Sequence, residues 1–206
     1  MNMNHSRNVL LARSVSLTPS RGFTIVELLV VIVVIAILAS VSIVAYNGIQ
    51  DRAQSAKAAS AFDTYIQVLQ MYYLDHGTYP SSMDGGGYMA CLGEVSDYPA
   101  DSTFAAGECY GPPDGSGKGT ANNARVNSAL NEALKSYAGS LPDGSIPKVT
   151  NGYMSRGLIY QSSYEQNASI LYFLKGNGLS CGNGKAMSSG SLTTCYINLA
   201  NGAIST

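Results

Sequence analysis

The chain has 206 residues, enough for one domain with a hydrophobic core of ordinary size. Its formal net charge is −1, but Arg7, Arg13 and Arg21 precede every acidic residue, and the part from Phe23 onward carries nine Lys or Arg against 13 Asp or Glu. Such a mildly acidic body argues against nucleic-acid binding, which normally needs a basic patch. Charged residues make up only 12% of the chain, which favours an exposed, loop-rich, β-containing surface over a charged cytosolic enzyme.

A polar, basic leader precedes a long apolar run. Residues 1–22 contain no apolar stretch and no A-x-A cleavage site, so they do not form an ordinary secretory signal. Leu28 to Tyr46 then supplies 19 residues without charge, interrupted only by Ser40 and Ser42. As a helix this run is roughly 28 Å long, close to the hydrocarbon thickness of a bilayer. We therefore expect a single transmembrane helix, with the N-terminus in the cytoplasm because the arginines precede it.

The junction between leader and run is "RGFTIVELLVVIVVIAILASVSIVAYNGIQ", residues 21–50. It resembles the prepilin signature (class III signal) of type IV pilins and of the pseudopilins of type II secretion. The matching features are a basic leader that ends in Gly22, then Phe23, Thr24 and Glu27, and then the apolar helix. The resemblance is close over residues 21–50 and covers the rest only as architecture. It implies cleavage between Gly22 and Phe23 by a prepilin peptidase, and N-methylation of Phe23.

Glu27 has two interpretations, which the sequence leaves open. Thr24 and Glu27 fit a capping box, and a carboxylate in the first helical turn meets the favourable end of the helix dipole. The resemblance implies a second role in assembly. Cleavage would create an ammonium on Phe23, and an unpaired carboxylate and amine are both costly in a dry bundle of helices. A pair formed between neighbouring subunits would set their axial register.

The helical pattern continues beyond the apolar run. Apolar residues recur at spacings of three or four and predict one buried face, made of Ala53, Ala56, Ala59, Phe62, Ile66, Leu69 and Tyr73. Gly77 and Pro80 end the helix, which we place at about residues 24–75. Gly48 is a position where it can bend. We divide the mature chain into a transmembrane or filament-core helix, 23–50, and an extracytoplasmic head, 51–206.

Residues 76–150 are expected to be mainly loop. The stretches "DGGG" and "GPPDGSGKG" are typical of turns. Neither a regular calcium-loop spacing nor a Walker pattern is present, so we predict no metal and no cofactor. One short amphipathic helix is predicted within "ANNARVNSALNEALKSYAG", with Gly139 as its end.

For the last part of the chain, residues 151–206, the pattern predicts an antiparallel meander. Its three strands are "YMSRGLIYQS", "ASILYFLKG" and "TCYINLAN". The four cysteines form no CxxC pair, and their even number in an exported head favours disulfides. We favour the pairs Cys91–Cys109 and Cys181–Cys195, while the other two connectivities and four free thiols remain open.

Together these elements predict an α+β fold. The resemblance implies the type IV pilin fold, in which a long N-terminal helix packs its outer half on a C-terminal antiparallel sheet. It also implies a structural subunit of a pilus-like filament. The implied partners are identical or homologous pilin subunits, the prepilin peptidase and the membrane assembly platform, with no nucleic acid. The protein would be a single-pass cytoplasmic membrane protein before assembly and part of an extracellular filament afterwards.

Three other functions are weighed against a main pilus subunit. Two are related to it, namely a type II secretion pseudopilin and a minor pilin. The third is a single-pass, membrane-anchored extracellular binding domain. We predict no enzyme and no catalytic residues, because beyond the leader the chain has a single histidine, His76, and no recognisable nucleophile elbow.

Overall fold

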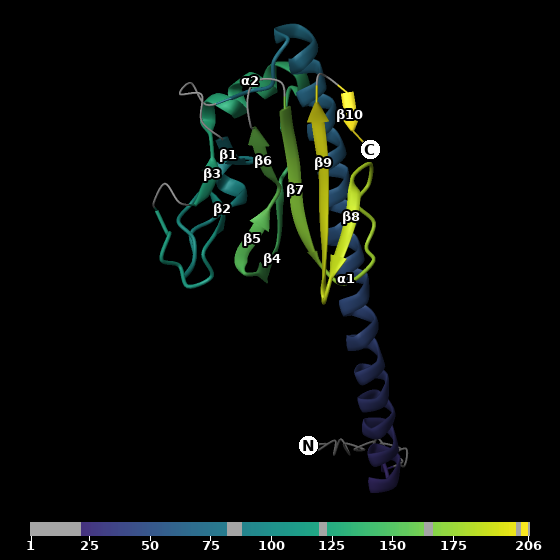
Figure 1. The fold of residues 1–206 in the computed structure, drawn as a ribbon. Helices are drawn as coiled ribbons and strands as arrows, with labels where there is room; N and C mark the ends of the chain where they lie inside the picture. The colour runs from purple at the N-terminus through teal and green to yellow at the C-terminus, as the bar shows by residue number, and fades with distance from the viewer. Residues whose placement is uncertain (1–21, 82–87, 120–122, 163–166, 201–202, 206) are drawn as a thin grey trace, which may run out of the picture. The chain divides into compact units, whose positions relative to one another are not determined.

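The computed structural model describes residues 22–81, 88–119, 123–162, 167–200 and 203–205. The chain divides into two units, residues 1–45 and 46–206. Helix α1, Ile25–His76, contributes to both units and has nearly the limits predicted from the sequence (Figure 1). Its backbone stays helical at Gly48. The predicted leader, apart from Gly22, lies outside the described residues.

In the first unit, α1 is apolar and exposed. Its large hydrophobic side chains from Phe23 to Leu38 are 47% to 85% exposed. Among the described residues, no helix combines the length and the apolarity that crossing a membrane requires. The predicted span, Leu28 to Tyr46, includes residues 41–46, whose side chains lie outside the description.

In the second unit, α1 lies along one face of a β-sheet and buries one of its own faces (Figure 1). That face consists of Ala58, Ala61, Phe62, Tyr65, Ile66, Val68 and Leu69. The prediction was right for Phe62, Ile66 and Leu69. It was wrong for Ala53 and Ala56, which are exposed, because they lie on the opposite side of the helix.

The strands and the remaining helices follow in chain order. They are β1 (Tyr88–Cys91), the short 3₁₀ helix η1 (Val95–Asp97), β2 (Glu108–Gly111), β3 (Ala124–Val126), α2 (Ser128–Ala138), β4 (Ser145–Asn151), β5 (Tyr153–Gly157), β6 (Ile159–Ser162), β7 (Asn167–Lys175), β8 (Lys185–Ser189), β9 (Leu192–Ala200) and β10 (Ala203–Ser205). Residues 76–150 therefore contain more regular structure than predicted. Their strands have only three to seven residues, and abundant turn residues interrupt the alternation that reveals a strand.

All described strands join one sheet in the order β10-β9-β7-β6-β1-β3-β2-β5-β4, with β8 paired to β9. The β7–β9 ladder is the longest, running from Asn167 opposite Ala200 to Lys175 opposite Leu192. The predicted α+β class is confirmed, but the sheet is mixed rather than wholly antiparallel, because β1 and β3 are parallel. Parallel neighbours need a crossover connection, and the long segment between β1 and β3 supplies it.

Helix α2 is shorter than the sequence predicted. It begins after Asn127, whose side-chain oxygen accepts a hydrogen bond from the N–H of Leu130 at 3.0 Å. Before this N-cap, residues Ala124–Val126 form β3 instead. The helix ends as predicted at Gly139, which has a φ of 70° and donates its N–H to the carbonyl of Lys135. Asparagine caps a helix because its side chain replaces a missing intrahelical acceptor.

The core of the second unit lies between α1 and the sheet. Along β7, the residues Ala168, Ile170, Tyr172 and Leu174 are buried and alternate with more exposed ones. This alternation places every second side chain toward α1, and the rings of Phe62 and Tyr172 are 5.1 Å apart. Burying such aromatic pairs contributes both apolar area and favourable ring contacts.

Candidate functional site

The predicted cleavage bond lies just outside α1. Gly22 and Phe23 precede the first helical residue, Ile25. The Phe23 side chain is 82% exposed, and no heavy atom of the described residues beyond the two chain neighbours lies within 4 Å of where a Cβ would stand on Gly22. Cleavage of the bond between these two residues remains a prediction.

The start of α1 is a complete capping box. The N–H and the Oγ1 of Thr24 both donate to Oε2 of Glu27, each at 2.8 Å. In return, the N–H of Glu27 donates to Oγ1 of Thr24 at 3.1 Å. This reciprocal pairing satisfies main-chain donors that have no partner within the helix. The local interpretation of Glu27 is confirmed, and its assembly role remains a prediction.

The four cysteines form the two disulfides favoured from the sequence. Cys91 is bonded to Cys109 and joins β1 to β2, with a Cα–Cα distance of 5.8 Å. Cys181 is bonded to Cys195 and joins the segment before β8 to β9, with a Cα–Cα distance of 5.3 Å. All four side chains are buried. Each disulfide encloses a glycine-containing loop and reduces the conformational freedom of the unfolded chain.

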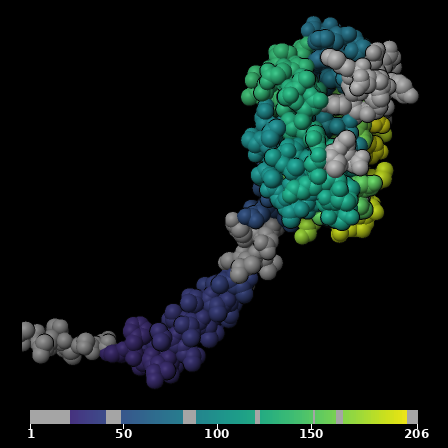
Figure 2. All heavy atoms as spheres, turned by 90° about the vertical axis from the view of Figure 1, so that its left-hand side faces the viewer, coloured from purple at the N-terminus to yellow at the C-terminus, as the bar shows by residue number. Residues whose placement is uncertain are grey.

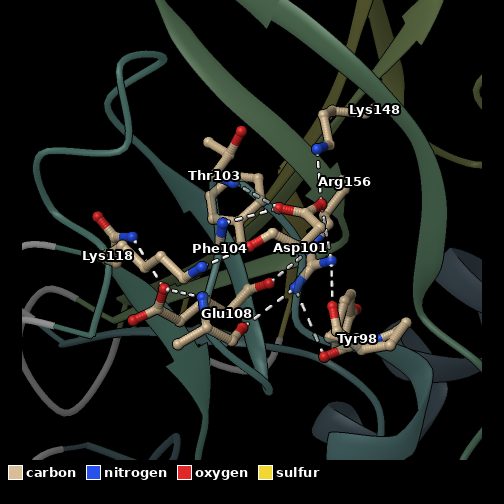
Figure 3. Close-up of polar contacts among 11 residues, drawn as sticks. Tyr98, Asp101, Thr103, Phe104, Glu108, Lys118, Lys148 and Arg156 are labelled. Atoms are coloured by element: carbon tan, nitrogen blue, oxygen red, sulfur yellow. Dashed lines mark hydrogen bonds and ion pairs between the residues drawn. The ribbon is translucent and has the colours of Figure 1, made fainter.

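Sequence reasoning missed a buried arginine on β5. The side chain of Arg156 is 9% exposed, and its guanidinium lies beside the rings of Tyr98 and Phe104 (Figure 3). Five donors in a planar fork can serve several acceptors at once. The main-chain acceptors are the carbonyls of Tyr98, Pro99, Ala105 and Glu108, at 2.6–3.4 Å. Arg156 thereby holds together a segment that contains no long strand or helix.

Asp101 is the carboxylate partner of this arginine, with 3.3 Å between Oδ2 and Nη1. Its Oδ1 accepts the N–H groups of Thr103 and Phe104 at 2.7 and 2.8 Å, and its Oδ2 accepts Nζ of Lys148 at 2.6 Å. Burial acts to raise the pKa of Asp101, but the hydrogen bonds from Lys148, Phe104 and Thr103 outweigh it and hold the pKa well below its usual range. Asp101 is therefore ionised at neutral pH.

Glu108 on β2 is a second carboxylate of this region, with its side chain only 1% exposed. Its oxygens accept from the N–H of Ala105 at 2.8 Å, the amide of Asn123 at 3.1 Å, the N–H of Gly119 at 2.7 Å and Nη2 of Arg125 at 3.0 Å. Burial acts to raise the pKa of Glu108, but the hydrogen bonds from these donors outweigh it, so the pKa of Glu108 lies below its usual value. Both carboxylates accept hydrogen bonds from within the chain and so fix it. The described part of the segment between β1 and β3 (teal) faces the viewer in Figure 2.

The described residues contain no group of three or more His, Cys, Asp or Glu placed to hold a metal ion. The arrangement around Arg156 consists of hydrogen bonds and ion pairs within the chain, and its geometry fixes a loop. One feature of the sequence could have indicated this arrangement. Arg156 stands at a position predicted to be in a strand, and an arginine buried there would need a partner, because arginine is rarely buried unless it is paired.

Comparisons with known proteins address the helix start. Residues 17–43 match the family described as the prokaryotic N-terminal methylation motif. The chain is 37% identical over 70 residues to a fimbrial protein of Neisseria meningitidis serogroup A, and 36% identical over 85 residues to the type II secretion system core protein G of Pectobacterium carotovorum. It is 29% identical over 129 residues to the type IV major pilin protein PilE1 of Neisseria gonorrhoeae.

These matches cover 34%, 39% and 63% of this chain, and 41%, 54% and 68% of the respective relatives. No solved structure matches the chain. The resemblance of the chain to type IV pilins and to a type II secretion core protein is thus confirmed. It is carried most firmly by the residues around the start of α1.

A first prediction concerns Arg156. In Arg156→Lys, one ammonium replaces a five-donor fork, so several buried carbonyls lose their donor. We expect the free energy of unfolding to fall by roughly 3 kcal/mol, because each buried acceptor left without a donor costs about 1–3 kcal/mol. Urea unfolding of the oxidised, detergent-solubilised chain measures it. The control Arg52→Lys, on an exposed part of α1, should stay within about 0.5 kcal/mol of the parent. Equal stability of Arg156→Lys and parent would contradict the role.

A second prediction concerns pH. Because the pKa of Asp101 is lower in the folded than in the unfolded chain, its stabilisation is present above about pH 4 and is lost as the pH falls toward the folded pKa. Asp101→Asn should therefore be less stable at pH 7 and lose less stability between pH 5 and pH 2. Unfolding free energies across this range test it. Glu132→Gln, which removes an exposed carboxylate, is the control, and an Asp101→Asn profile parallel to the parent's would refute the prediction.

Proposed function

We propose that the chain is a structural subunit of a type IV pilus-like surface filament. The observation that carries this proposal is the start of α1, where Gly22, Phe23 and the Thr24–Glu27 capping box are followed by an exposed apolar helix. The methylation-motif match over residues 17–43 covers the same residues. The relatives named as pilins support the same function.

In this proposal the chain is made as a precursor. A prepilin peptidase cuts between Gly22 and Phe23 and methylates the new amine of Phe23. The exposure of Phe23 and the non-helical backbone before Ile25 are compatible with that cleavage. Before cleavage, Leu28 to Tyr46 anchors the chain in the cytoplasmic membrane, with the head outside, because the basic residues lie on the N-terminal side.

Assembly then transfers the helix from lipid to other subunits. The side chains from Phe23 to Leu38 are apolar and exposed in the single chain, so they suit either environment. Glu27 is the one carboxylate among them. We propose that it pairs with the Phe23 amine of a neighbouring subunit, because leaving either charge unpaired in a dry bundle is costly.

The second unit fits the type IV pilin plan. One face of α1 is buried together with β7 and β9, and a disulfide joins Cys181 to Cys195 near the C-terminus. We assign the head no catalytic role. Its histidine, His76, is exposed and stacks on Tyr72 with ring centres 4.1 Å apart, and its Nδ1 lies 3.1 Å from the Tyr72 carbonyl.

A type II secretion pseudopilin is the second candidate. The likeness to the core protein G of Pectobacterium carotovorum, 36% identical over 85 residues, favours it specifically. Both functions require the same processing and the same helix. They differ in whether the chain is the main component of a surface filament or of a secretion apparatus.

The processing itself gives a direct prediction. Mass spectrometry of the mature protein should find N-methyl-Phe23 as its first residue. Electron microscopy with peptide identification should find the chain as the dominant subunit of sheared surface filaments. A functional protein that retains residues before Gly22 would exclude the pilin and the pseudopilin alike, whereas processing without surface filaments would favour the pseudopilin.

A further prediction separates the two roles of Glu27. Glu27→Gln keeps a side chain that can complete a capping box but removes the charge, so it should be inserted and cleaved normally and yield at least tenfold fewer filaments. The control Thr24→Val removes the capping side chain and keeps the carboxylate, and it should retain filaments. The measurement is the amount of sheared filament relative to the amount of the chain in membranes, and it distinguishes the assembly role from the capping role. Parental filament numbers in Glu27→Gln would rule out the pairing role.

A further inference from the structure

One asparagine of the head stands in a sequence that can be modified. Asn167 is followed by Ala168 and Ser169, and it is the only asparagine after Gly22 with a serine or threonine two positions later. Asn-x-Ser/Thr, where x is not proline, is the acceptor pattern for N-linked glycosylation, in which the side-chain amide carries an oligosaccharide. Such a triplet also arises by chance, so its place in the fold is the stronger evidence.

The fold places Asn167 where a bulky attachment is tolerated. Asn167 is the first residue of β7 and is exposed. Its neighbour Ala168 is 5% exposed and belongs to the core shared with α1. Because successive strand side chains point to opposite faces, Asn167 and Ser169 lie on the face of the sheet opposite α1, which is turned toward the viewer in Figure 1. A glycan on Asn167 would extend from this face without displacing the core.

The neighbouring strands present uncharged polar side chains on the same face. Ser169 lies opposite Gln161 of β6 and opposite Asn198 of β9. Residues directly opposite each other in antiparallel strands share a face, and none of these three is buried. Their amides and hydroxyl can both donate and accept hydrogen bonds, as sugar hydroxyls do. This row is therefore a hydrophilic surface on which an oligosaccharide can lie.

Two other asparagines of the head show the opposite case. Nδ2 of Asn123 donates to Oε2 of Glu108 at 3.1 Å, and Nδ2 of Asn131 donates to the carbonyl of Gly93 at 2.8 Å. Both residues are buried, so a sugar on either amide would break a buried hydrogen bond and open the core. Asn167 differs from them because it combines the acceptor sequence with an exposed side chain.

The disulfides indicate a compartment that suits this modification. Cys91–Cys109 and Cys181–Cys195 are both formed in the head, and disulfides persist in oxidising environments outside the cytoplasm. The proposed function places the head in the same compartment, next to the membrane. A glycan donor carried on a membrane lipid can reach the chain there.

We propose that Asn167 carries an N-linked oligosaccharide, which a membrane oligosaccharyltransferase transfers from a lipid diphosphate carrier. The inference goes beyond the proposed function and uses only the export of the head from it. The amide nitrogen of Asn167 bonds to the anomeric carbon of the first sugar, and the bond from that carbon to the diphosphate oxygen breaks. The lipid diphosphate leaves with that electron pair, and the amide nitrogen gives up one proton to a base. No oxidant or reductant takes part.

Mass spectrometry of the chain purified from the cells that naturally make it tests the proposal. Trypsin cleaves after Arg156 and Lys175 and releases the peptide of residues 157–175. Fragmentation that preserves side-chain modifications should locate the mass of an oligosaccharide on Asn167. Recovery of this peptide only in its unmodified form would overturn the inference.

Four single variants in the same cells test the acceptor pattern. Asn167→Gln and Ser169→Ala should each lower the amount of glycosylated peptide at least tenfold, whereas Ser169→Thr keeps the required hydroxyl and should retain the parental amount. The matched control is Asn198→Gln, which changes an exposed asparagine on the same face that lies outside the pattern, and it should also retain the parental amount. A sugar that persists in Asn167→Gln would place the modification on another residue and refute the proposal.

Sheared filaments from the parental cells separate this inference from the proposed function. Filaments built from a chain that lacks the glycan would overturn the inference and leave the filament function standing. A chain glycosylated on Asn167 that forms no filaments would support the inference and remove the filament function.

Discussion

The burial of one face of α1 against the sheet is the packing interaction on which the rest of the head depends. Phe62 and Tyr65 are fully buried there, and the same helix also holds the loops at the margins of the sheet. The hydroxyl of Tyr65 donates to the carbonyl of Pro142 at 2.8 Å, ahead of β4, and Asp63 accepts the N–H of Asn183 ahead of β8. Because α1 supplies apolar area and polar anchors together, loss of its packing would release segments from both ends of the sheet.

The part of the head between β1 and β3 is held in a different way. Its strands are short, its apolar side chains form a small cluster around Tyr98 and the disulfide, and its turns leave main-chain carbonyls that need donors. The disulfide Cys91–Cys109 closes the ends of the loop, while Arg156 binds four carbonyls along it. A buried arginine is tolerated there because Asp101 and the carbonyls satisfy its charge and its donors.

These two modes of stabilisation explain what the sequence could predict. The limits of α1 and the capping box follow from patterns within a few residues, so both were predicted. The exposed Ala53 and Ala56 were assigned to the core because repeated spacings of three drift around a helix of 3.6 residues per turn, so that the set no longer shares one face with Phe62. The Arg156 contacts were missed because their acceptors are carbonyls about 50 residues away in the chain, and any residue type supplies a carbonyl.

The hydrogen bonds around Glu27 show how capping and assembly can be compatible. Both bonds from Thr24 end on one carboxylate oxygen, Oε2, whereas a carboxylate offers two oxygens and about four acceptor sites. An ammonium from Phe23 of another subunit can therefore approach Oε1 without breaking the cap. The cap limits the rotamers of the carboxylate, so less side-chain entropy is lost when the pair forms. Under the proposed function, the local role thus prepares Glu27 for the intermolecular one, and the two roles need not compete.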